Sequence, residues 1–220
     1  MRINSIQTDA IKINNLEVED IKDFTYLGSI VSTSGGTDEG IKARKRKAQQ
    51  AFAMLRPVWR KKALRTRTKI RIFNTNVKSV LLYGSETWRE TSTSMKSVQV
   101  FVNKCLRNIL GIRWPDVISN ANLWKRTNQQ PVEITIRTRR WNWIGHTLRK
   151  PSTNITKQAL EWNPQGQRKR GRPKNTWRRV LTSDLKKIGK TWGEAKTIAQ
   201  DRGRWKATVV ALCSPWDEVN

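Results

Sequence analysis

Residues 94–111 read SMKSVQVFVNKCLRNILG and contain the clearest structural pattern in the chain. Apolar side chains recur there at steps of three and four residues, namely Met95, Val98, Phe101, Val102, Cys105, Leu106, Ile109 and Leu110. This spacing places them on one face of an α-helix, and that face must be buried against other elements. Ser94 is placed to cap the start of the helix, and Gly111 is placed to end it. The stretch therefore predicts a long amphipathic helix within a mainly helical fold.

The same helical period occurs on both sides of this stretch. It predicts helices over residues 41–59, 66–83, 119–126, 131–148, 175–188 and 191–212. Pro57 is expected to bend or end the first of these helices, and Gly84 to end the second. Pro131 suits the first residue of its helix. Thr191 and Glu194 form a capping-box pattern that opens the last one.

The first forty residues show the period of β-strands instead. Residues 11–13 and 16–18 alternate around Asn14 and Asn15, which suit a tight hairpin turn. Residues 24–31 form a second run rich in aromatic and β-branched side chains, and it ends at a turn over residues 34–36. The predicted fold class is mainly α, with a short N-terminal β-hairpin and strands followed by a helical bundle and a C-terminal helical extension.

Charge and composition divide the chain into four predicted parts. Residues 1–40 hold three basic and seven acidic side chains, whereas residues 41–220 hold 41 basic and ten acidic ones. Residues 150–173 contain three of the seven prolines and show no apolar period. We therefore predict a β segment over residues 1–40, a helical domain over 41–149, a basic linker over 150–173 and a C-terminal helical extension over 174–220.

The net charge of +27 makes nucleic acid the first partner to consider, because such a charge attracts polyanions. The sequence contains no apolar run of the roughly 18 residues that a membrane helix needs, so no membrane partner is predicted. Two widely separated cysteines, Cys105 and Cys213, argue against a disulfide framework and fit a reducing compartment. An intracellular protein is expected, and the nucleus is the compartment that fits its partner.

Catalytic chemistry finds little support in these residues. After Gly40, the only acidic residues within two positions of each other are Asp217 and Glu218, so no carboxylate cluster for Mg²⁺ is indicated. His146 is the only histidine, and no glycine-rich nucleotide-binding motif occurs. We predict no catalytic residue, no metal ligand and no cofactor in this chain.

Eleven tryptophans are a second unusual feature, and most of them neighbour an Arg or a Lys. Such pairs could stack on bases and bind phosphates, or they could anchor a helical core with the Arg stems packed across the rings. Most of these tryptophans lie at helical spacing from other apolar residues, which favours the core.

The most basic stretch is residues 167–179, QRKRGRPKNTWRR, with seven positive charges. Its Arg170-Gly171-Arg172-Pro173 has the form of an AT-hook, in which glycine permits close approach to the minor groove and proline keeps the chain extended. Two other interpretations stay open: general phosphate contact, and a solvated loop or nuclear-localisation cluster. The predicted nucleic-acid-binding residues are Arg168, Lys169, Arg170, Gly171, Arg172, Pro173, Lys174, Arg178 and Arg179, together with Arg139 and Arg140.

Several separated segments resemble the region downstream of the polymerase palm in reverse transcriptases of non-LTR retrotransposons, particularly the RTE-like group that also encodes an endonuclease. The matching segments are residues 24–29 (FTYLGS), 81–88 (LLYGSETW), 105–110 (CLRNIL), 139–146 (RRWNWIGH), 171–177 (GRPKNTW) and 199–202 (AQDR) with Trp205. Their order also matches, and the resemblance covers about residues 20–213.

The resemblance implies a role for each part of the chain. It implies a primer-grip hairpin at Phe24, Tyr26, Leu27 and Gly28, then a thumb of helices that holds an RNA or DNA template–primer or duplex DNA by phosphate contacts. The family's polymerase uses Mg²⁺ at an aromatic-Ala-Asp-Asp motif, which this sequence lacks. The resemblance therefore implies a truncated or domesticated fragment that is inactive alone, with a palm-containing reverse transcriptase segment as a further partner. The alternative is a stand-alone DNA-binding adaptor that uses the AT-hook-like segment.

Overall fold

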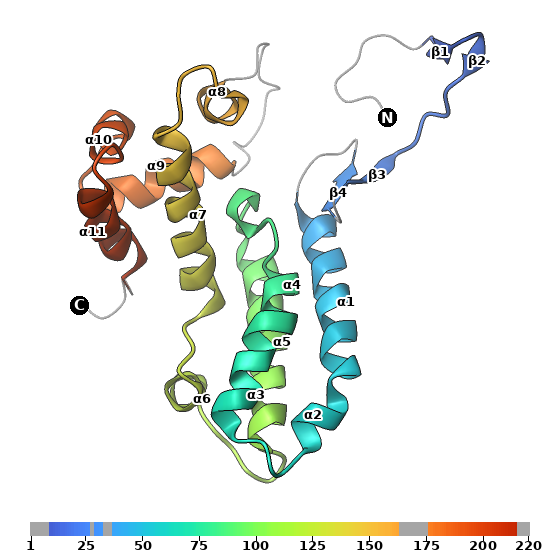
Figure 1. The fold of residues 1–220 in the computed structure, drawn as a ribbon, viewed down its shortest axis with the longest axis vertical. Helices are drawn as coiled ribbons and strands as arrows, with labels where there is room; N and C mark the ends of the chain where they lie inside the picture. The colour runs from blue at the N-terminus through green and yellow to red at the C-terminus, as the bar shows by residue number, and fades with distance from the viewer. Residues whose placement is uncertain (1–8, 27–28, 33–36, 163–175, 215–220) are drawn as a thin grey trace. The chain divides into compact units, whose positions relative to one another are not determined.

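The computed structural model describes residues 9–26, 29–32, 37–162 and 176–214. Two antiparallel strand pairs come first along the chain, and helices follow to the end of the described residues (Figure 1). The predicted fold class is confirmed. Among the described residues, every helix is too short or too polar to cross a lipid bilayer.

The N-terminal strands form two hairpins. β1 (Lys12–Ile13) pairs with β2 (Leu16–Glu17) around Asn14 and Asn15, whose φ angles of 50° and 64° are those of a type I′ turn. β3 (Asp23–Tyr26) pairs with β4 (Ser29–Ser32) in the register that places Tyr26 opposite Ser29. The run over residues 24–31 is therefore a hairpin of its own.

The chain forms two compact units, which differ from the four predicted parts. Unit 1 comprises Met1–Gly84 and Lys96–Leu123, and unit 2 comprises Ser85–Met95 and Trp124–Asn220. The sequence predicts boundaries where composition changes, whereas the units follow packing. In particular, α7 (Val132–Leu148) packs on α11 (Arg202–Cys213), although the predicted linker separates the two helices in the sequence. Both helices therefore belong to unit 2.

Unit 1 is built on helices that the periodicity predicts. They are α1 (Asp38–Met54), α2 (Arg56–Arg60), α3 (Thr66–Ile72), the π-helix η1 (Phe73–Lys78), α4 (Ser79–Leu81) and the greater part of α5 (Ser92–Leu110). α1 lies against η1 and α4 (Figure 1). The buried apolar side chains of this unit include Ile41, Ala48, Ile70, Phe73, Val77, Leu81, Leu82, Val102 and Leu106.

One turn in the middle of unit 1 is wider than an α-helical turn, and the sequence pattern does not foresee it. Residues 66–81 are continuous helix, as predicted, but the η1 part is a π-helix. Polar side chains bond to carbonyl oxygens at this turn: Thr75 Oγ1 donates to Arg71 O at 3.1 Å, and Asn76 Nδ2 donates to Ile72 O at 3.0 Å. These bonds help to satisfy carbonyls where the regular α-helical pattern changes.

The ends of α5 test the two capping predictions made for this helix. At its start, Thr91 accepts a hydrogen bond from the Ser94 N–H, so Thr91 is the capping residue and the prediction for Ser94 is wrong. At its end, Gly111 has a φ of 74°, and the N–H groups of Gly111 and Ile112 bond to the carbonyls of Asn108 and Arg107. This is the Schellman motif, and the predicted helix end is confirmed.

Unit 2 packs its helices around one apolar cluster. Besides α7 and α11 it contains the 3₁₀ turn η2 (Ser85–Thr87), α8 (Ile155–Glu161), α9 (Trp177–Lys187) and α10 (Trp192–Ile198), while α6 (Asn120–Thr127) begins in unit 1 and ends in unit 2. The cluster consists of Trp141, Ile144, Leu148, Leu160, Leu181, Leu185, Ala195, Ala199, Trp205, Val209 and Leu212.

Three details of unit 2 differ from the sequence prediction. The predicted linker contains α8, which buries Leu160 in the cluster. Pro131 is the N-cap of α7 rather than its first helical residue. The last predicted helix is two helices, because Asp201 caps α11 by accepting hydrogen bonds from the Gly203 and Arg204 N–H groups. The capping box of Thr191 and Glu194 is present as predicted.

Several tryptophans lie in the core, as the helical spacing favours. Trp59, Trp88, Trp141 and Trp205 are buried, whereas Trp114 and Trp162 are exposed. The Trp205 indole donates to the Trp141 carbonyl at 3.0 Å, and a side chain at Gly145 would overlap that indole. Residues 139–146 and Trp205 are thus joined by packing within unit 2.

Candidate nucleic-acid interface

Positive charge gathers around one cavity of unit 1. A cleft of about 710 Å³ is bounded by α2, the start of α3, the C-terminal ends of α1 and α5 and the connections that follow α2 and α5. We call it the basic cleft. Its basic lining residues are Arg56, Arg60, Lys62, Lys69, Lys104 and Arg113, and none of the described residues that line it is acidic.

An aromatic pair forms one wall of the basic cleft. The rings of Phe52 and Trp59 are stacked with centroids 5.0 Å apart and an angle of 17° between their planes. The Trp59 indole donates to the Phe52 carbonyl oxygen at 2.8 Å, and the buried Lys69 Nζ donates to the Trp59 carbonyl oxygen at 2.8 Å. These bonds fix α2 against the end of α1 and hold the Lys69 cation at the Trp59 backbone.

Local sequence explains why the chain turns at this place. α1 ends at Met54, and Pro57 lies in the first turn of α2, where its missing N–H costs no hydrogen bond. On the opposite side, the Gly111 turn ends α5 and leads the chain to Arg113. Both turns depend on residues whose backbone preferences are read directly from the sequence.

The charges that line the basic cleft favour an anionic ligand. Arg56, Arg60, Lys62, Lys104 and Arg113 are exposed, so their charges are available to a ligand in water. Like charges around a concave surface repel one another and focus a positive potential into it. Arg side chains bind phosphate oxygens in pairs, and Lys side chains add point charges.

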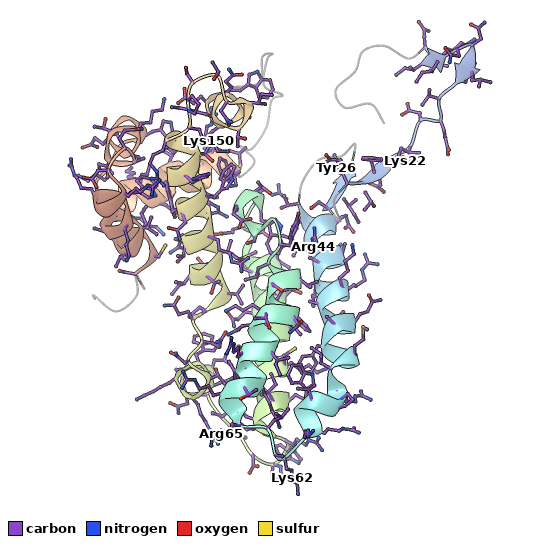
Figure 2. All side chains as sticks on the ribbon, in the orientation of Figure 1. Lys22, Tyr26, Arg44, Lys62, Arg65 and Lys150 are labelled. Carbon is purple, nitrogen blue, oxygen red and sulfur yellow. The ribbon has the colours of Figure 1, made fainter. Side chains whose placement is uncertain are left out.

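The positive surface continues beyond the cleft. Figure 2 labels Lys62 and Arg65 at the connection between α2 and α3, and Lys61, Arg65 and Arg67 are exposed.

Arg44 on α1, labelled in the same figure, is buried, and its guanidinium carbon lies 4.3 Å from the centre of the Tyr83 ring. This cation–π contact holds the segment that follows α4 to α1, so Arg44 has a packing role.

The structure describes half of the predicted primer-grip residues. Phe24 and Tyr26 are exposed on β3, with ring centroids 6.4 Å apart, and they form an open aromatic surface. Leu27 and Gly28 lie outside the described residues. The assignment of this hairpin as a primer grip stays a prediction.

Arg140 lies where a phosphate cannot reach it. Its side chain is fully buried, and its Nη2 is 2.6 Å from Glu90 Oε1 and 3.1 Å from the Trp88 carbonyl oxygen. The pKa of Glu90 is raised, because the effect of burial exceeds the lowering by Arg140 and Arg137. Arg140 compensates the buried Glu90 carboxylate and satisfies backbone carbonyls within unit 2. We therefore remove Arg140 from the predicted nucleic-acid-binding residues.

The remaining predicted binding residues are spread over different environments. Arg168, Lys169, Arg170, Gly171, Arg172, Pro173 and Lys174 lie outside the described residues. Arg139 is half-buried on α7. Arg178 Nη2 donates to the carbonyl oxygens of Leu160 and Trp162, both at 2.9 Å, and so holds the end of α8. Arg179 is exposed and lines a separate pocket of unit 2 that Glu90, Glu133 and Asp184 also line.

The described residues bring no three His, Cys, Asp or Glu side chains together as a group that could hold a metal ion. His146 is exposed on α7. Cys105 is a buried thiol, and burial raises its pKa to about 12, with nearby Lys104 lowering it by less. At neutral pH the thiol is therefore uncharged and adds to the apolar surface of α5.

Comparison with known proteins identifies a transposon-derived relative. It is similar to an uncharacterized transposon-derived protein of Caenorhabditis elegans, with 24% identity over 204 residues that cover 88% of this chain and 72% of that protein. The model of a domain of unknown function, DUF6451, matches residues 51–83. No solved structure matches the chain.

The DUF6451 match coincides with much of the basic cleft. Residues 51–83 include the aromatic wall and the cleft residues of α2 and α3. Lys104 and Arg113, which complete the cleft from α5 and the turn after it, lie beyond the matched stretch.

Proposed function

We propose that this chain binds nucleic acid through the basic cleft, as the thumb-like part of a transposon-derived reverse transcriptase. The observation that carries the proposal is the cleft itself, where six basic residues meet a stacked aromatic pair. The transposon-derived relative supports the same context. In this proposal the chain holds a template–primer or duplex by its phosphates.

The shape of the basic cleft favours nucleic acid over other extended anions. A concave site lined by cations surrounds a strand of phosphates, whereas a flat lipid surface is contacted by a planar or convex basic face. Aromatic rings beside the cations suit a ligand that has bases as well as phosphates. The ligand class we propose is therefore a nucleic-acid backbone.

Binding is the role that we assign to this cleft. Its lining combines cations, aromatic rings and an amide, which suit phosphates and bases, whereas Mg²⁺ takes carboxylate oxygens from its protein ligands. Polymerisation would then need a palm supplied by a partner segment. The exposed aromatic surface of Phe24 and Tyr26 is the proposed contact with that palm. A nucleus-localised protein fits this role.

A second candidate function is the stand-alone DNA-binding adaptor that uses residues 168–174. Its support is the Arg-Gly-Arg-Pro pattern, which lies outside the described residues. The two functions predict different contact sites on the protein, so mapping the contacts separates them.

Salt titration tests the proposed function. Five exposed cations line the basic cleft. If each contacts one phosphate, the logarithm of the association constant falls with the logarithm of salt concentration with a slope of about −4.5. Affinity for duplex DNA is then expected to drop by a few hundred-fold between about 50 and 200 mM salt. Fluorescence anisotropy of a labelled duplex measures it, and an affinity that is independent of salt contradicts the proposal.

A further inference from the structure

A second cavity of unit 1 adjoins the basic cleft and differs from it in chemistry. It has a volume of about 610 Å³ and lies between α1, α5 and the segment that leads into α6. Its apolar lining consists of Phe52, Val100, Phe101, Cys105 and Ile112. We call this cavity the amide pocket, because four of its other lining residues are Gln49, Asn103, Asn108 and Asn120.

Part of the apolar lining is exposed to water. Val100 is 58% exposed although it lies on the helix that supplies much of the unit 1 core. The neighbouring Cys105 is buried, and its raised pKa keeps the thiol neutral. A ligand that covered this surface would remove apolar area from water, which favours a ligand with an apolar face.

The amide groups add hydrogen-bonding capacity around this apolar surface. Gln99 Nε2 donates to Asn103 Oδ1 at 2.8 Å, and Asn103 Nδ2 donates to Asn120 Oδ1 at 3.0 Å. Arg107 Nη2 also donates to Asn120 Oδ1, at 2.8 Å, so the Asn120 side chain is fixed in orientation. Gln49 and Asn108 are exposed at the rim, and each amide carries both donors and acceptors.

The amide pocket and the basic cleft share four residues. Phe52, Lys104, Asn108 and Arg113 line both cavities. A strand whose phosphates contact Lys104 and Arg113 is therefore close enough to place one of its bases in the amide pocket. The required ligand has an apolar planar face, an edge of donors and acceptors and an adjacent negative charge, and a nucleotide has all three.

We propose that the amide pocket holds the base of one unpaired nucleotide while the adjoining phosphates lie on Lys104 and Arg113. This inference rests on the proposed function, which supplies the strand. A base within a duplex is stacked and paired, and its removal from the stack costs a few kcal/mol. An unpaired base is free of that cost, so the pocket selects bulged or single-stranded positions.

The test compares three ligands on the full chain at low salt: a blunt duplex, the same duplex with one bulged nucleotide, and the same bulge with an abasic residue. The bulge with its base is expected to bind about tenfold more tightly than the abasic bulge, because one well-placed base contact provides a difference of this size. Val100→Phe fills the pocket and is expected to abolish that difference. The matched control is Val210→Phe, since Val210 on α11 is 64% exposed, and it should retain the difference.

The outcomes separate this inference from the function on which it rests. Equal affinity of the wild-type chain for the base-containing and abasic bulges overturns the amide-pocket proposal, even where the blunt duplex binds with strong salt dependence. Failure of all three ligands to bind overturns the proposed function as well. Thermal unfolding of both valine variants checks whether they are folded. A folded Val100→Phe variant that still binds the base-containing bulge more tightly than the abasic bulge also overturns the proposal.

Discussion

Replacing Arg56 and Arg60 together by glutamate is expected to weaken duplex binding roughly 100-fold at about 0.1 M salt. Each substitution removes an attraction to phosphate and adds a repulsion, and a change of about 1.4 kcal/mol at each site gives this factor. Both side chains are exposed and line the basic cleft, so the fold should tolerate the change. Fluorescence anisotropy with the duplex of the salt titration measures the loss.

The matched control reverses two charges elsewhere. Lys186 on α9 and Lys206 on α11 are exposed and belong to unit 2. Their replacement by glutamate changes the net charge by the same amount, and it is expected to weaken binding less than about fivefold. Equal losses in the two double variants would mean that total charge, rather than the basic cleft, governs affinity.

Arg140→Met is expected to lower the free energy of unfolding of unit 2 by about 3–5 kcal/mol, because it leaves the buried Glu90 carboxylate without its partner. The Arg140 side chain is fully buried and also bonds to the carbonyl oxygens of Trp88 and Glu86. Chemical denaturation followed by circular dichroism measures the change. A loss below about 0.5 kcal/mol, the usual range for surface substitutions, would contradict the role that we assign to Arg140.

Two controls distinguish a buried ion pair from a general packing defect. Adding Glu90→Gln to Arg140→Met removes the unpaired charge and is expected to recover part of the stability. Burial raises the Glu90 pKa, and the loss of Arg140 raises it further. A raised carboxyl pKa gives stability that is present at low pH and lost as pH rises through the folded-state pKa. The deficit of Arg140→Met should therefore shrink as the pH is lowered toward about 4.5, the ordinary value for Glu.

Local chemistry made much of the fold predictable. Gly111 ends α5 because glycine adopts a positive φ, and Asn14 with Asn15 turns the first hairpin for a similar reason. Apolar spacing identifies every long helix. Sequence failed where two local signals compete or where packing decides, as at Thr91, which caps α5 in place of Ser94, and at α8 within the predicted linker.

The basic cleft was not predicted, because its residues are dispersed along the sequence. Arg56 and Arg113 line the same cavity although more than fifty positions separate them, so no short window shows their combined charge. A local signal was nevertheless present: Phe52, Arg56 and Arg60 recur at steps of four, which indicates a common side of a helical segment.

Arg140 shows the opposite error: the adjacent Arg139 and Arg140 suggested a binding site, but Arg140 is buried. A run at steps of four contains Val132, Ile136, Arg140, Ile144 and Leu148, which places Arg140 among apolar residues on the buried side of α7. That period distinguishes Arg140 from its neighbour Arg139, which is half-buried. Counting charges alone cannot make this distinction.

The central claim is that nucleic acid contacts the basic cleft, and photocrosslinking tests it most directly. A duplex that contains a photoreactive base analogue is bound to the full chain at low salt and irradiated, and the crosslinked peptides are identified by mass spectrometry. The predicted crosslinks lie within residues 51–69 and 104–113, which contain the cleft-lining residues. Crosslinks confined to residues 163–179 would contradict the claim and favour the AT-hook-like segment as the binding site.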